Sequence, residues 1–178
     1  ASVLLQAVGV VSFALLTVLS AKVQFRFYLW EVPITLQTAA VYASGLYLGW
    51  RNGLFAQALY LVLGLFLPVF AGDGYGAGYL FGLASAGYLL SYPAAAALIG
   101  ALSKRWKAFS GSTLASMVGA AFIFTCGVVW LHYAAGHATW MESIYKGFLR
   151  FVVIDLAKVI GVGLLYSGTR YLARGGNA

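Results

Sequence analysis

Long runs of apolar residues, separated by short polar connections, restrict this chain to few folds. Hydrophobic residues make up 62% of its 178 residues and charged residues only 8%. A water-soluble domain of this size needs far more polar side chains to cover its surface. A helix needs about 20 apolar residues to cross a bilayer, and six segments are candidates for such helices. We therefore expect an all-α, polytopic integral membrane protein, in which residues 1–178 form a single domain with six transmembrane helices.

The six predicted helices cover residues 2–21, 35–48, 53–70, 83–102, 112–133 and 147–172. The first apolar stretch is longer than the core of a signal peptide and has no basic segment before it. We therefore expect it to be a retained membrane helix.

The formal charge of +7 comes from basic residues that gather in alternate connections. The connections after the second and fourth predicted helices, and the C-terminal end, hold Arg51, Lys104, Arg105, Lys107, Arg170 and Arg174 and no acid. The positive-inside rule places these connections and both termini in the cytoplasm. Glu31, Asp73 and Glu142 lie in the other connections, which then face outside. Membrane orientation explains the basic residues better than nucleic-acid binding does.

An acid and a base interrupt the apolar part of the last predicted helix. Asp155 and Lys158 are three residues apart, so they share one helix face. Asp155 lies eight residues, about 12 Å, beyond Gly147, which places the pair in the outer half of the membrane. Charges at this depth are costly and usually face a partner or a water-filled cavity. The pair is either a local salt bridge that lets the helix insert or part of a ligand site, and we favour the ligand site because leucine could fill a purely structural role.

Two outer connections have the composition of binding-site walls. Residues 31–38 combine an acid, a proline and short polar side chains at the start of a helix. Residues 71–79 are dense in glycine, which lets a backbone approach a ligand closely, although a flexible connector is the alternative. This loop lacks the Gly-Lys-Ser/Thr ending of a phosphate loop, so we do not expect nucleotide binding.

Neither enzymatic nor metal chemistry is indicated. The sequence contains no nucleophile elbow and no His-Glu-x-x-His motif, so we do not expect an enzyme. His132 and His137 are five residues apart, a spacing that fits no common helical pair of metal ligands. We expect neither a metal nor a cofactor.

Residues 32–38 read Val-Pro-Ile-Thr-Leu-Gln-Thr, which resembles the signature of the BioY family. The similarity continues through residues 49–53, 56–65, 67–72 and 86–93, and through Asp-Leu-Ala-Lys at residues 155–158. The sequence departs from the family at residues 82–89, where a proline is absent and Ser85 stands for a threonine.

The resemblance implies a biotin-binding S component of an energy-coupling factor transporter in the cytoplasmic membrane of a prokaryote. Such a protein captures biotin on the outer side and works with a membrane coupling subunit and two cytoplasmic ATPases; operation without a dedicated ATPase module is the alternative. The resemblance also implies a pocket that the first and third loops close over the last three helices. An S component for another small vitamin, or a membrane assembly protein that packs through small residues such as Gly45 and Gly49, is the alternative.

Biotin combines an apolar bicyclic core, a ureido group with two N–H donors and a carbonyl, and a carboxylate. The substrate-binding residues that the resemblance implies are Asp155, Lys158, Thr35, Gln37, Tyr75, Tyr79, Ser85 and Tyr88. Asp155 can accept a hydrogen bond, and Lys158 can pair with the carboxylate or donate to the carbonyl. The sequence does not decide which of the two residues meets which end of biotin. For each tyrosine, anchoring at the membrane interface is the alternative.

Overall fold

The computed structural model describes residues 2–28, 30–106 and 109–175. Lys107 and the side chain of Arg174, both counted among the basic residues above, lie outside this description. The helices are α1 (Val3–Lys22), α2 (Gln37–Phe66), α3 (Ala77–Gly82), α4 (Ala86–Arg105), α5 (Phe109–Ala134), α6 (Trp140–Ile144), the π-helical turn η1 (Tyr145–Leu149) and α7 (Val152–Gly175). Two short strands, β1 (Gln24–Phe25) and β2 (Ile34–Thr35), pair antiparallel.

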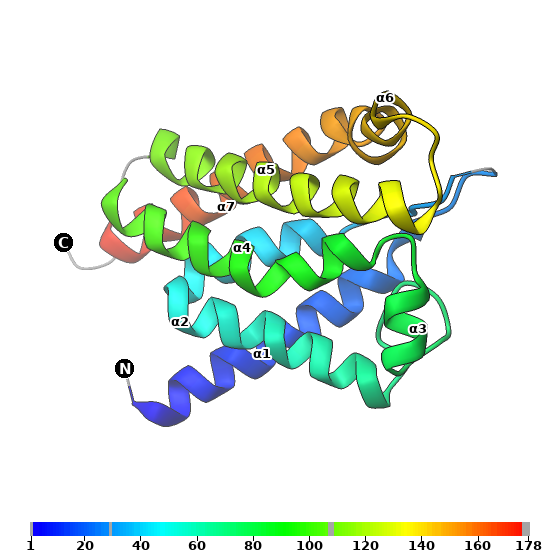
Figure 1. The fold of residues 1–178 in the computed structure, drawn as a ribbon. Coiled ribbons are helices and arrows are strands. Elements are labelled where there is room, and N and C mark those ends of the chain that lie inside the picture. The colour runs from blue at the N-terminus through cyan, green and yellow to red at the C-terminus, as the bar shows by residue number, and fades with distance from the viewer. Residues whose placement is uncertain (1, 29, 107–108, 176–178) are drawn as a thin grey trace.

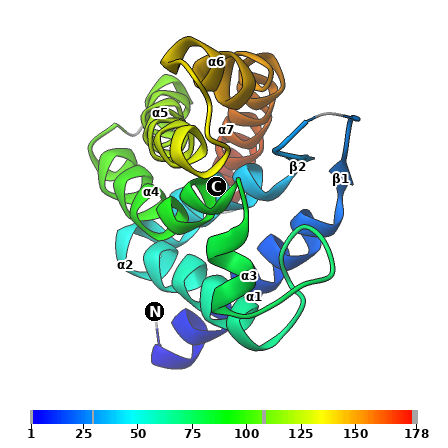
Figure 2. The same cartoon turned by 45° about the vertical axis from the view of Figure 1, so that its right-hand side comes forward.

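The long helices run side by side in one bundle (Figure 1). α1 begins and α7 ends at one end of the bundle, whereas α3, α6 and the two strands lie at the other end (Figures 1 and 2). This arrangement confirms the all-α class.

Gly49 turns the chain back on itself inside α2. Its φ of 75° lies in the left-handed region, which side chains with a Cβ atom rarely adopt. The two halves of α2 then lie against each other, and Gln57 Nε2 donates to Ser44 Oγ across them at 3.1 Å. The two helices predicted at residues 35–48 and 53–70 are therefore present as the halves of α2. A single glycine replaces the expected connection, and Thr35 belongs to β2 instead of a helix.

Three helical stretches of the described chain are long and apolar enough to cross a membrane: Val3–Lys22, Ala86–Arg105 and Ser110–Ala134. Large apolar side chains of α1, such as Val3 and Leu4, lie exposed on the outside of the bundle, as expected for a surface that meets lipid.

The last predicted helix was expected to run without interruption over residues 147–172, but the structure has an irregular start there. Residues 145–149 form a π-helical turn, and α7 starts only at Val152. The carbonyl oxygen of Gly147 accepts a hydrogen bond from Tyr88 Oη at 2.7 Å. This bond ties the irregular turn to α4, so a contact between distant helices holds the start of α7.

Candidate functional site

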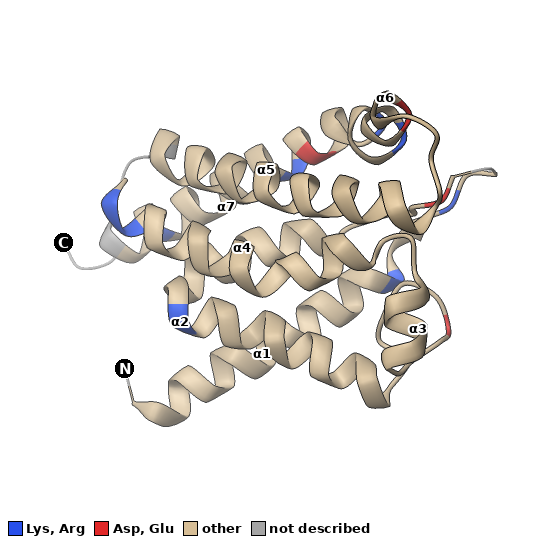
Figure 3. Cartoon of the chain, viewed as in Figure 1, with Lys and Arg blue, Asp and Glu red and all other residues tan. Residues whose placement is uncertain are grey.

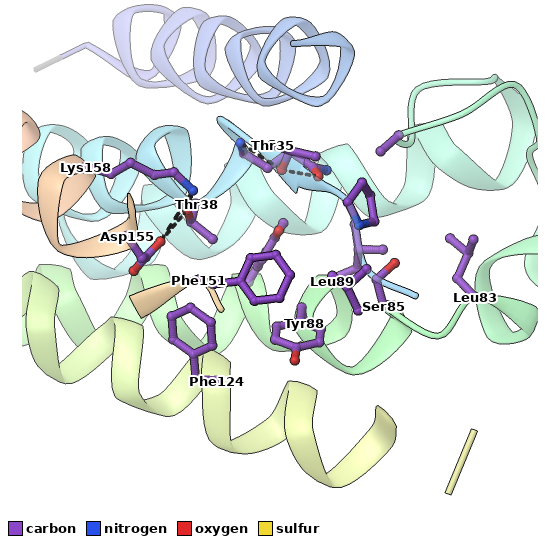
Figure 4. Close-up of a pocket in the computed structure, with 15 residues that line it drawn as sticks. Thr35, Thr38, Leu83, Ser85, Tyr88, Leu89, Phe124, Phe151, Asp155 and Lys158 are labelled. Carbon is purple, nitrogen blue, oxygen red and sulfur yellow. Dashed lines mark hydrogen bonds and ion pairs between the residues drawn. The ribbon is translucent and has the colours of Figure 1, made fainter. Parts of the chain in front are cut away.

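A cavity lies between α2, α4, α5 and α7, toward the end of the bundle that carries the strands (Figure 4). Its lining combines polar side chains on one wall with aromatic and aliphatic side chains on the others. The lining residues are Val32, Pro33, Thr35, Gln37, Thr38, Ala71, Leu83, Ser85, Tyr88, Leu89, Tyr92, Phe124, Phe151, Asp155 and Lys158.

Asp155 and Lys158 form the charged part of the polar wall, and α2 holds them in place. Asp155 is only 3% exposed; its Oδ1 accepts from Thr38 Oγ1 at 2.8 Å and its Oδ2 from Tyr42 Oη at 2.5 Å. Lys158 Nζ donates to Thr38 Oγ1 at 3.0 Å and lies 3.5 Å from Asp155 Oδ1. Thr38 therefore bridges the two charged groups, as Figure 4 shows. A buried charge is tolerated when hydrogen bonds and an opposite charge surround it, and Asp155 has both.

The start of α2 supplies a second, uncharged part of the polar wall. Thr35 Oγ1 donates to Gln37 Oε1 at 2.9 Å, and Gln37 Nε2 donates to Tyr60 Oη at 2.6 Å. Thr35 is also paired with Gln24 in the short sheet. The sheet and Tyr60 thus fix this corner of the cavity from two sides.

Aromatic rings close the other walls of the cavity. Tyr88 packs edge-on against Phe124 with 6.1 Å between ring centroids, and Phe151 meets Trp30 in the same way at 5.5 Å. The rings of Tyr88, Phe124 and Phe151 line the cavity and come from α4, α5 and the residue just before α7. They offer an apolar slot next to the charged pair, an arrangement suited to a ligand with a flat apolar core and a polar edge.

Six of the eight predicted substrate-binding residues line this cavity: Thr35, Gln37, Ser85, Tyr88, Asp155 and Lys158. Tyr88 presents its ring, because its hydroxyl is bonded to the Gly147 carbonyl. Tyr75 and Tyr79 do not line the cavity. Tyr75 is 60% exposed, and Tyr79 stacks on Phe70 with its hydroxyl 3.5 Å from the Ala71 carbonyl oxygen.

Several residues of the site were not among the eight predicted substrate-binding residues, although Thr38 lies in the wall predicted at residues 31–38. Thr38 and Tyr42 are the partners of Asp155, and they lie one turn apart on α2, so helical spacing from Thr38 could have indicated Tyr42. Phe151 lies one turn before Asp155, and Tyr92 lies one turn after Tyr88. Helical spacing from the predicted residues could therefore have indicated these two as well. Phe124 has no such signal, because only the packing of α5 brings it to the cavity.

Polar contacts join the loops that border the cavity. Lys22, at the end of α1, donates from Nζ to the carbonyl oxygens of Pro68 at 2.8 Å, Phe70 at 3.0 Å and Gly72 at 2.9 Å. These three bonds shape the loop that supplies Ala71 to the cavity wall. A lysine at the end of one helix therefore orders a loop about fifty residues away in sequence.

A second set of contacts links residue 31 to the segment after α5. Lys146 Nζ lies 2.9 Å from Glu31 Oε1 and 2.8 Å from Glu142 Oε1. Partial burial alone would raise the pKa of Glu31, but hydrogen bonds from Lys146 and His137 outweigh it and leave that pKa below its usual value. The same lysine lowers the pKa of Glu142, and its two carboxylate partners raise the pKa of Lys146. We call this group, Glu31, Glu142 and Lys146, the loop latch.

His132 and His137 both approach one hydroxyl: their Nδ1 atoms lie 2.9 and 3.0 Å from Ser143 Oγ. Among the described residues, no group of three or more His, Cys, Asp or Glu side chains is placed to hold a metal ion.

Membrane-length apolar helices, together with a cavity that sets an ion pair beside aromatic walls, define a membrane protein that binds a small, partly apolar ligand. The chain belongs to the BioY family, whose model matches residues 2–174.

Relatives of known name support this assignment. The biotin transporter BioY of Thermotoga maritima is 34% identical over 135 residues, which cover 75% of this chain and 78% of the relative. The probable biotin transporter BioY of Lysinibacillus sphaericus is 31% identical over 169 residues, covering 90% of this chain and 84% of the relative. Among solved structures, the S-component for biotin from an ECF-type ABC transporter matches with a TM-score of 0.86 at 23% identity. This match covers 94% of this chain and 92% of the other and establishes a shared fold.

Proposed function

We propose that this protein is the biotin-binding S component of an energy-coupling factor transporter, which captures biotin on the outer side for uptake across the membrane. The observation that carries this proposal is the Asp155–Thr38–Lys158 cluster on the wall of an apolar cavity, in a chain of the BioY family. The protein binds and delivers the vitamin and catalyses no reaction.

The chemistry of the cavity favours one orientation of biotin. The ureido group is neutral, so its burial beside Asp155 and Lys158 costs less than burial of the carboxylate would. Asp155 accepts from the ureido N–H groups, and Lys158 donates to the ureido carbonyl oxygen. The bicyclic core lies between the rings of Tyr88, Phe124 and Phe151.

The valerate chain then points toward the loops at the mouth of the cavity. In this orientation the carboxylate stays near water and away from the negative charge of Asp155. Val32, Ala71 and Ser85 line this side of the cavity and come from loops or a helix start. Ser85 contributes a hydroxyl at the N-cap position of α4.

We propose six membrane spans within a single domain, with both termini in the cytoplasm of a prokaryotic cell. The spans are α1, the two halves of α2, α4, α5 and α7. The reversal at Gly49 supports separate crossings by the two halves of α2. The charge distribution supports the orientation. Arg51 follows the kink of α2, and Lys104 and Arg105 lie in the last turn of α4. Figure 3 shows basic positions at this end of the bundle, where α1 begins, and acidic positions in the loops at the other end. α7 holds Asp155 and Lys158 toward the bundle interior, which permits these charges within a span.

The sequence has no phosphate-binding motif, so ATP hydrolysis for uptake would take place on other subunits. We therefore propose that a membrane coupling subunit and two cytoplasmic ATPases act with it. Biotin is the transported ligand, and no bound cofactor takes part.

The test is a calorimetric titration of detergent-purified, ligand-free protein with biotin. The decisive variant is Asp155→Asn with Lys158→Ala, and a matched control is Asp73→Asn with Arg51→Ala, which removes one acid and one base outside the cavity lining. We expect tight one-to-one binding by the wild type and the control, and loss of binding in the cavity variant. A folded, ligand-free wild type that does not bind biotin would refute the proposal. Binding of another vitamin would then indicate a different S component, and binding of none would favour an assembly protein.

A further inference from the structure

A second cavity lies at the opposite end of the bundle, and the proposed capture of biotin does not use it. It has a volume of about 320 Å³ and forms where the kink of α2 meets the last turns of α4 and α7. Its walls include Tyr47, Gly49, Ser103, Lys104, Tyr166 and Arg170. We call it the basal cavity.

Two cations with spare hydrogen-bonding capacity face the basal cavity. The ammonium of Lys104 makes no hydrogen bond or ion pair with any residue in the described part of the chain. Its aliphatic part passes Gly49, where an added Cβ would lie 3.7 Å from Lys104 Cε. Arg170 Nη1 donates to Tyr166 Oη at 3.2 Å, and among the described residues the other guanidinium donors have no hydrogen-bond acceptor.

Tyrosines give the cavity a rigid wall. Tyr47 and Tyr166 meet edge to face with 5.0 Å between ring centroids, and Tyr47 Oη is 2.9 Å from Thr169 Oγ1. The Arg170 guanidinium lies over the Tyr166 ring, 5.4 Å from its centroid. The arginine is thus held in place before any ligand arrives, which lowers the entropy cost of binding.

Neutralisation of the negative helix C-termini is a competing explanation for the position of these cations. α4, α7 and the first half of α2 all end here, and each C-terminus carries about half a negative charge. The three ends together amount to roughly −1.5 charges, while α1, α5 and the second half of α2 begin at this end and each N-terminus carries about half a positive charge. Arg51, Lys104, Arg105 and Arg170 carry four full positive charges at the same end. Glu31 precedes β2, Asp73 precedes α3 and Glu142 belongs to α6, and these elements lie at the other end of the bundle (Figure 1). Among the described residues, Figure 3 shows no acidic position at the end where α1 begins, and Asp155 is buried inside the bundle. The helix ends therefore offset less than half of the positive charge, and the basal cavity remains electropositive.

We propose that the basal cavity binds the phosphate headgroup of an anionic phospholipid, in the leaflet that is cytoplasmic in the proposed topology. Phosphate oxygens accept hydrogen bonds from a lysine and an arginine, and basic pockets between membrane helices suit such headgroups. A lipid fits better than a free anion because its chains hold the headgroup at the depth where these helices end. Tyr47, 41% exposed, lies at this rim and offers a contact for the lipid. A bound headgroup would link the α2 kink to the ends of α4 and α7.

The experiment uses delipidated full-length protein, titrated with phosphatidylglycerol or phosphatidylcholine and followed by native mass spectrometry and thermal unfolding. The pocket variant is Lys104→Gln with Arg170→Gln. The matched control is Arg51→Gln with Arg105→Gln, which removes two charges at the same end but outside the cavity lining. We expect the pocket variant to bind phosphatidylglycerol about 25-fold more weakly than the wild type, at about fivefold per cation. The control should stay close to the wild type, and phosphatidylcholine should bind weakly to all three.

Other outcomes would overturn the proposal. Equal losses in the pocket variant and the control would show diffuse attraction to a charged surface. Equal binding of both lipids would remove the role of the negative charge. Inorganic phosphate that protects the wild type as well as phosphatidylglycerol does would assign the cavity to a free anion. If the double variant fails to fold, Lys104→Gln alone provides the same comparison with Arg105→Gln, since both side chains are exposed.

Discussion

Two of the polar clusters in this apolar bundle differ in one respect: one borders the ligand cavity and the other does not. The closed cluster consists of Thr17, Ser44 and Gln57, all fully buried. Gln57 Nε2 donates to Thr17 Oγ1 and Ser44 Oγ, both at 3.1 Å, and these hydroxyls also donate to backbone carbonyls of their own helices. The open cluster consists of Thr38, Asp155 and Lys158 and faces the cavity.

The difference shows that burial of polar groups in a membrane bundle does not by itself mark a binding site. Neutral groups that satisfy one another stabilise helix packing and leave nothing for a ligand. A charged pair beside an empty space keeps acceptors and donors that a ligand can use. Lys158 has three N–H donors, and within the described part of the chain its partners are Thr38 and Asp155. We therefore expect substitutions in the open cluster to change biotin affinity, and substitutions in the closed cluster to change stability.

The largest effect should come from Asp155→Asn. In the proposed orientation of biotin, the change removes the charge that accepts the ureido N–H groups, and hydrogen bonds to charged groups contribute about 1.5–3 kcal/mol each. We expect biotin affinity to fall about 100-fold or more, measured by calorimetry on the folded protein. A decrease of only a few fold would contradict the assigned role of Asp155.

Thr38→Val in the open cluster can be compared with Thr17→Val, which is the same change in the closed cluster. The first variant removes the hydroxyl that bridges Asp155 and Lys158, and we expect affinity to fall about tenfold. The second should leave affinity unchanged. Equal effects of the two variants on biotin affinity would break the distinction between the clusters.

Gln57→Leu tests the closed cluster directly. The change removes both bonds that Gln57 donates, while Thr17 and Ser44 keep their bonds to backbone carbonyls. We expect the free energy of unfolding to fall by about 1–3 kcal/mol, at about 0.5–1.5 kcal/mol per bond, with unchanged biotin affinity. Thermal unfolding in a fixed detergent, with and without biotin, measures both quantities.

We expect the smallest effect at the loop latch, which lies outside both the open and the closed cluster. The pKa of Glu31 is lowered in the folded protein, so the contribution of its contacts is fully present above the usual value of 4.5. It is lost as the pH falls through the lowered pKa. At neutral pH, Glu31→Gln should speed biotin release by less than about fivefold, because exposed ion pairs contribute little.

The difference in release rate between the wild type and Glu31→Gln should vanish as the pH falls below the lowered pKa. Stopped-flow displacement of biotin at several pH values measures this difference, and the variant serves as the control for titration of biotin itself. A difference that persists when Glu31 is protonated would show that its charge is not the cause.

Much of the fold was predictable from local sequence. Apolar runs long enough to cross a membrane indicated helices, and a charged pair three residues apart indicated one polar helix face. The motif at residues 32–38 indicated the family, which the family match confirmed. The start of α7 and the reversal at Gly49 were not predicted, because the first is tied to Tyr88 on a distant helix and the second rests on one backbone angle.

The sequence by itself determined the helical class, the apolar surface and the residues that carry charge. Backbone hydrogen bonding in a helix is local, so spacing along the chain suffices for these features. Only the tertiary structure decided that Asp155 meets Thr38, 117 residues away, and that Tyr75 and Tyr79 stand outside the cavity. It also brought Lys104 and Arg170 to one basal cavity. Contacts of this kind depend on how side chains of separate helices pack, which spacing along one helix does not specify.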